Sequence, residues 1–83
     1  MNNLYLLTLL AWDGYKIIPF QCVIMVLFDL DKEMAKLEND KEIADFNKDL
    51  FKKLGKDIKG FVPNRSADEI RDIRLVYWKK LER

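Results

Sequence analysis

Histidine is absent from this chain, and cysteine occurs once, as Cys22. One chain therefore cannot form a disulfide, a zinc site built from Cys and His, a Cys/His nucleophile pair or a Ser-His-Asp triad. Because these absences remove the common enzyme chemistries, we expect no catalytic residue, no metal ligand, no cofactor and no enzymatic activity. Cys22 lies in an apolar run, which predicts a small buried hydrophobe, and a chain without disulfides fits the reducing cytoplasm.

Glycine and proline are scarce as well, with three and two residues in a chain of 83. The composition is 49% hydrophobic and 35% charged, which excludes a disordered or low-complexity chain. This length predicts one domain, residues 1–83, whose core is near the lower limit of independent stability. Small domains of this kind are often stabilised by oligomerisation or by a bound partner.

About half of the apolar residues fall between Leu4 and Leu30. As one helix this segment would be long enough to cross the roughly 30 Å hydrocarbon layer of a membrane. However, Asp13, Lys16 and Pro19 interrupt it, and an acidic or lysine side chain at mid-membrane costs about 3 kcal/mol. We therefore expect no membrane span, and the segment should be buried in the chain's own core or against a partner.

The dipeptide Asp13-Gly14 divides this apolar segment, and it can be interpreted in two ways. As a type I′ turn it would join strands over residues 4–12 and 15–26. As a helix end, Gly14 would be the C-cap of a first helix, and Pro19 would lie in the first turn of a second helix. Residues 4–12 do not alternate with polar residues, and Pro19 would interrupt a strand ladder, so the helical interpretation is favoured.

The second helix is expected to continue beyond Leu30, because apolar residues recur there at spacings of three and four. This stripe comprises Phe20, Val23, Leu27, Leu30, Met34 and Leu37. A third helix is predicted from the Asn39-Asp40 cap to Gly55. Its apolar positions follow the 3.6-residue period at Ile43, Phe46, Leu50, Phe51 and Leu54.

A last helix is predicted from Ser66 to about Leu81, because Ser66 and Glu69 have the spacing of a capping box. Its inward face would comprise Ile70, Ile73, Tyr77 and Leu81. The sequence therefore predicts an all-α fold, a small four-helix bundle-like single domain. The alternative is an α+β fold with an N-terminal hairpin at Asp13-Gly14 and two C-terminal helices.

Residues 23–31, Val-Ile-Met-Val-Leu-Phe-Asp-Leu-Asp, resemble the first motif of the haloacid dehalogenase phosphatases. The resemblance implies a nucleophilic Asp29 and an acid/base Asp31 after a strand of a parallel sheet. That motif continues with Gly and Thr or Val, whereas Lys32 and Glu33 follow here, and 83 residues are too few for the family's sheet. We therefore keep the prediction that the chain is not an enzyme.

A second apolar strip is predicted on the outer side of the last helix, where Leu75 and Trp78 would lie beside Arg71 and Arg74. Trp and Arg are the residues most enriched in binding hot spots. The strip and the surplus of apolar residues predict a non-enzymatic interaction protein of the inhibitor or adaptor type, which binds a protein partner or itself. Small helical proteins encoded by mobile elements often have this profile.

The alternative function is a nucleic-acid-binding regulator. Residues 1–49 hold five basic and nine acidic side chains, whereas residues 50–83 hold ten basic and five acidic ones. Lysines in the basic half are candidates for phosphate contacts. They are Lys52, Lys53, Lys56 and Lys59.

Overall fold

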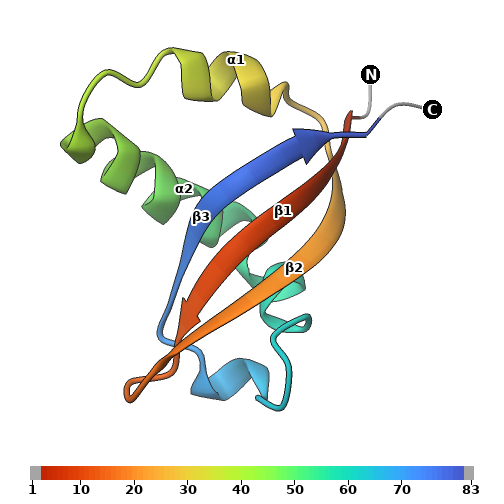
Figure 1. Ribbon diagram of the computed structural model, residues 1–83, viewed down its shortest axis with the longest axis vertical. Helices are drawn as coiled ribbons and strands as arrows, with labels where there is room; N and C mark the ends of the chain where they lie inside the picture. Colours follow the sequence, from red (N-terminus) through yellow and green to blue (C-terminus); the bar gives the residue numbers. More distant parts are fainter. Residues whose placement is uncertain (1–2, 82–83) are drawn as a thin grey trace.

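The computed structural model describes residues 3–81 and has an α+β fold, in which a three-stranded antiparallel sheet carries its helices on one face (Figure 1). Its elements are β1 (Asn3–Trp12), β2 (Ile17–Val26), α1 (Leu30–Ala35), α2 (Asp40–Lys59), the 3₁₀ turn η1 (Ala67–Glu69) and β3 (Asp72–Lys80). The strand order is β2-β1-β3, so the first strand lies in the middle. The predicted all-α bundle is wrong, and the alternative α+β reading fits.

Strand β1 explains why the first helix was predicted wrongly. Its inward side chains are fully enclosed, with exposed fractions of 0–1%; they are Tyr5, Leu7, Leu9 and Ala11. Its outward positions are also apolar, apart from Thr8. Burial therefore alternates along β1 as a strand requires, whereas hydropathy does not, and only hydropathy can be read from a sequence.

The hairpin between β1 and β2 is built around Asp13. The strands pair from Trp12 opposite Ile17, so the loop has four residues, not the two of a type I′ turn. One Asp13 carboxylate oxygen accepts the backbone N–H groups of Tyr15 and Lys16 at 2.9 and 2.8 Å, and Gly14 has a φ of 94°. This positive φ is the conformation that glycine adopts without strain.

The predicted second helix is split between a strand and a short helix. Strand β2 contains Phe20 and Val23 and ends at Val26, whereas α1 begins only at Leu30. Pro19 is tolerated in β2 because β2 is an edge strand, where the missing N–H can face the free edge. Asp29 starts α1, since its carboxylate accepts the N–H of Lys32 at 3.3 Å.

Helix α2 confirms the predicted third helix but extends four residues past Gly55, to Lys59. The Asn39 side chain caps it by accepting the N–H of Glu42 at 2.9 Å. Gly55 is buried, and a Cβ atom there would lie 3.1 Å from the ring of Phe51. Gly55 therefore makes room for this ring inside the helix and does not end it.

The predicted last helix is wrong, although its start was placed correctly. The Glu69 carboxylate accepts the backbone N–H and the hydroxyl of Ser66, both at 3.1 Å, but the helix is only the turn η1. Strand β3 follows, and a β-bulge leaves Val76 without a partner between Leu75 and Tyr77.

The bulge shifts the alternation of side chains by one residue within β3. Leu75 and Trp78 consequently point to the core, whereas Tyr77 is 56% exposed. The helical prediction was the reverse: it placed Tyr77 on the inward face and Leu75 and Trp78 on the outer side. No local signal in the sequence marks the bulge.

The buried hydroxyl of Tyr5 joins the sheet to α1. It donates to the Asp29 carboxylate at 3.2 Å and accepts the N–H of Leu30 at 2.9 Å. Burial alone would raise the pKa of Asp29. The hydrogen bonds from Lys32 N–H and Tyr5, together with the charge of Lys80, outweigh burial and hold this pKa below its ordinary value.

Replacing Tyr5 by Phe should lower the free energy of unfolding by about 1–3 kcal/mol, because the buried N–H of Leu30 loses its acceptor. Urea denaturation followed by circular dichroism measures this change. Tyr15→Phe is the matched control, since Tyr15 is 95% exposed and should tolerate the loss of its hydroxyl. Equal stability of Tyr5→Phe and the parent chain would contradict this role.

Asp13→Asn should destabilise the chain at pH 7, because Arg65 Nε lies 2.9 Å from the other Asp13 carboxylate oxygen. The asparagine can still accept the turn N–H groups, so the variant isolates the ion pair. The N–H groups of Lys16 and Tyr15 and the Arg65 guanidinium hold the pKa of Asp13 far below its usual value.

This lowered pKa gives the prediction a pH dependence. The stabilisation is complete above the unfolded pKa of about 3.9 and is lost as the pH falls toward the folded pKa. The difference in urea midpoint between parent and variant should therefore be constant from pH 7 to about pH 5 and should shrink below about pH 4. A difference that grows on acidification would refute this assignment.

Candidate functional site: the open face of the sheet

One face of the sheet has no helix over it, and this face is turned to the viewer in Figure 1. We call its outward side chains the open face. They are Leu4, Leu6, Thr8, Leu10 and Trp12 from β1, Ile17, Pro19, Gln21, Val23 and Met25 from β2, and Asp72, Arg74, Val76, Tyr77 and Lys79 from β3. The strand register places them in rows across the sheet, such as Val23-Leu6-Lys79 and Pro19-Leu10-Arg74.

The open face is strongly apolar. Six of its large apolar side chains have exposed fractions of 47–62%: Trp12, Ile17, Val23, Met25, Val76 and Tyr77. Since an aromatic side chain offers about 150–250 Å² and an aliphatic one less, these six, each about half exposed, present on the order of 500 Å². The largest apolar patch of a typical monomer covers about 300–600 Å² and is often functional. The exposed apolar area of the open face therefore lies in the upper part of this range, even before the remaining residues of the face are counted.

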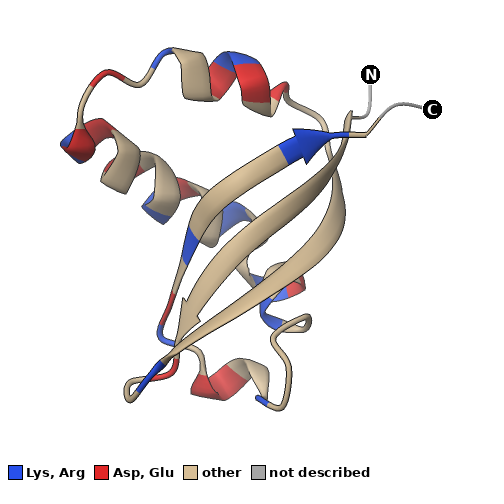
Figure 2. Ribbon diagram, in the orientation of Figure 1, with Lys and Arg blue, Asp and Glu red and all other residues tan. Residues whose placement is uncertain are grey.

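Charge is confined to one border of the open face. None of the ten outward positions on β1 and β2 carries a charge, and Figure 2 shows both strands without Lys, Arg, Asp or Glu. The charged residues Asp72, Arg74 and Lys79 all lie on β3. In the central row, the Gln21 amide donates to the Thr8 hydroxyl at 3.0 Å, and Tyr77 lies opposite Thr8.

Both free edges of the sheet carry features that oppose the addition of another strand. Pro19 interrupts the row of N–H donors along β2. On the edge of β3, the N–H of Leu75 already donates to the Asn47 side chain of α2 at 2.8 Å. Both features oppose strand addition.

A hollow of about 360 Å³ lies at the hairpin end of the open face. It is lined by Leu10, Ala11, Trp12, Ile17, Asp72 and Arg74. An apolar floor with one acidic and one basic side chain is suited to receive a side chain that carries a polar tip.

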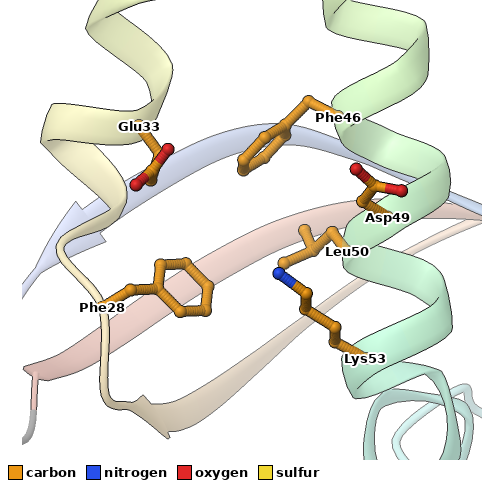
Figure 3. Close-up of a pocket in the computed structure, with 6 residues that line it drawn as sticks. All are labelled: Phe28, Glu33, Phe46, Asp49, Leu50 and Lys53. Atoms are coloured by element: carbon orange, nitrogen blue, oxygen red, sulfur yellow. The ribbon is translucent and has the colours of Figure 1, made fainter.

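A second hollow, of about 210 Å³, lies on the helical side of the molecule (Figure 3). Phe28 precedes α1, Glu33 belongs to α1, and α2 supplies Phe46, Asp49, Leu50 and Lys53. Lys53 Nζ reaches to 6.0 Å from the centre of the Phe28 ring. Among residues 3–81, no group of three or more His, Cys, Asp or Glu side chains is placed to hold a metal ion.

The structure separates the four residues predicted to bind a partner. Arg74 lies on the open face, whereas Arg71 precedes β3, where its N–H donates to the Trp12 carbonyl at 2.8 Å. Leu75 is buried in the core with an exposed fraction of 8%. Trp78 packs on the inner face, and its indole N–H donates to the Asp31 carboxylate. These residues do not form one surface, and they do not lie on a helix.

Sequence reasoning missed the main residues of the open face. Trp12, Ile17, Val23 and Met25 would have emerged from the hairpin alternative, because every second residue of a strand shares one face. Tyr77 would still have been missed, since the bulge decides its direction.

The lysines predicted to contact nucleic acid all belong to α2. Lys52, Lys53 and Lys56 are exposed, and Lys59 is half-buried with its Nζ 5.1 Å from the centre of the Phe51 ring. Within the described chain, none of these four lysines forms an ion pair. The acidic residues Asp40, Glu42, Asp45, Asp49 and Asp57 share the helix with them.

Asp29 and Asp31, which carried the resemblance to the phosphatases, have structural contacts. Asp29 caps α1 and accepts the Tyr5 hydroxyl, and Asp31 accepts the Trp78 indole N–H. The strand before them lies at the edge of an antiparallel sheet, not in the parallel sheet that the resemblance implies. Cys22 is buried as predicted, and burial raises the pKa of its thiol.

Comparisons with protein-family models, with curated proteins and with solved structures found no match to this chain. No helix within residues 3–81 is both long enough and apolar enough to span a membrane. The fold and the site define a small two-layer α+β domain with one uncovered apolar sheet face. Its function has to be inferred from that face.

Proposed function

We propose that this chain is a non-enzymatic interaction protein, of the adaptor or inhibitor kind, that binds a protein partner through the open face of its sheet. The observation that carries this proposal is that β1 is apolar on both faces although the helices cover only one. Antiparallel sheets with one face in water normally alternate apolar and polar residues. A strand without this alternation is typical of a sheet covered on both sides.

The residue types on the open face support a protein partner. Trp, Tyr, Met and Arg are enriched at the centres of protein interfaces, and the face presents Trp12, Tyr77, Met25 and Arg74. The charged residues lie along the β3 border, as expected for a polar rim. Because Cys22 is a free thiol within a chain that has no second cysteine, we assign this activity to the reducing cytoplasm.

Affinity capture with the full chain as bait tests this function. The parent chain should retain a protein partner from its source cells, and Val23→Lys should reduce the retained amount at least tenfold, because the new charge would be desolvated within the interface. Ile43→Lys is the matched control: Ile43 is 40% exposed, against 47% for Val23, but lies on α2. Equal loss in both variants, or none in either, would contradict the proposed function.

Nucleic-acid binding through α2 is a second candidate, supported by its exposed lysines, which form no ion pair within residues 3–81. Such binding should weaken steeply with salt, since each neutralised phosphate releases a counterion. A Lys52→Glu/Lys56→Glu double variant should then lose binding to a 20-base-pair DNA and to single-stranded RNA at 50 mM salt. Val23→Lys should not. Absence of binding by the parent chain at this salt concentration removes the candidate.

A further inference from the structure

We infer that the partner on the open face is a second copy of this chain, and that two sheets pack face to face in a two-fold symmetric dimer. This inference rests on the proposed function and names its partner. In a two-fold interface the same patch meets itself, so the patch has to be self-complementary in charge, hydrogen bonding and shape.

The charge distribution favours a copy of the chain. The ten uncharged positions on β1 and β2 would meet their counterparts without like-charge repulsion. They offer nothing that would select a strongly acidic or basic partner. The β3 border holds Asp72, Arg74 and Lys79, so it presents both signs of charge within one strand.

The central row of the open face is also suited to meet its own copy. Thr8, Gln21 and Tyr77 carry both hydrogen-bond donors and acceptors. The Gln21 amide is already anchored by the Thr8 hydroxyl at 3.0 Å. The groups that remain can pair with the same row of a second chain, which leaves no polar group unsatisfied at the centre of the interface.

The apolar area of the face approaches what one partner buries in a standard interface. Its six large apolar side chains with exposed fractions of 47–62% present on the order of 500 Å², and a standard interface buries about 800 Å² per partner. The partly buried Leu4, Leu6 and Leu10 and the exposed Pro19 extend the apolar area toward this value. An 83-residue domain with a one-sided core also gains stability from such burial.

The edges of the sheet decide the mode of packing. Pro19 in β2 and the Asn47 contact to β3 oppose a continuous sheet that runs across two chains. Face-to-face packing needs no free edge, and it holds two sheets about 10 Å apart with their strands crossing at about 30° or 90°. The dimer would have four layers, with the helices outside and the two sheets inside.

Sedimentation equilibrium of the full chain between about 5 and 300 µM tests this inference. The parent chain should sediment with twice its mass of 9.9 kDa at the upper concentrations. Val23→Lys on β2 and Tyr77→Lys on β3 should each sediment with the mass of one chain. Ile43→Lys on α2 should remain dimeric. Circular dichroism of each variant shows whether its sheet is intact. Because the two face variants lie on different edge strands, the result does not depend on a single variant that fails to fold.

The outcomes separate this inference from the proposed function. A parent chain with the mass of one chain at every concentration would overturn the dimer, while capture of a different protein that is sensitive to Val23→Lys would still support the proposed function. A dimer that persists in both face variants would overturn the assignment of the open face. Binding of a monomeric parent chain to phosphatidylcholine vesicles would also overturn the dimer and would assign the face to lipid.

Discussion

The structure depends on the complete burial of the inward face of β1. Its four inward side chains have exposed fractions of 0–1%, and they are enclosed because β1 pairs with a strand on each side while α2 covers it. Both neighbouring strands pair with β1, and the helices pack into the same core. Tyr5 anchors the start of α1 through its hydroxyl, and Leu50 and Ile58 bring α2 into the same core. One neighbour, β2, follows β1 directly through the hairpin, whereas the other neighbour, β3, is distant in sequence but adjacent in space.

The same strand also creates the surface that remains uncovered. Its outward positions are nearly as apolar as its inward ones, so the molecule buries one side of β1 and leaves the other side in contact with water. Most small domains avoid this with polar residues on the solvated face. The uncovered surface therefore links the fold to the proposed interaction, because a partner would enclose β1 from its second side.

Local signals in the sequence were reliable where local interactions decide the structure. The α2 stripe, the Asn39 cap and the Ser66–Glu69 pair lie where they were expected, and Asp13-Gly14 forms the hairpin turn of the alternative interpretation, not the helix end that was favoured. The prediction failed for residues 4–26, because a strand that is apolar on both faces has no period-two pattern to distinguish it from a helix. It failed for the candidate site for a related reason: Leu75, Tyr77 and Trp78 were assigned to helix faces, whereas a strand and its bulge direct them.

The sequence by itself determined the long helix α2, the burial of Cys22 and the surplus of apolar residues, and it marked an interruption at Asp13-Gly14 without deciding between a hairpin turn and a helix end. Each of these follows from composition or from contacts within a few residues. Only the tertiary structure decided that residues 3–12 form the central strand, that Val76 forms a bulge, and which apolar residues stay outside the core. The reason is that the pairing of β1 with β3 joins residues about 70 positions apart, such as Leu6 and Lys79. No local window of the sequence contains both partners.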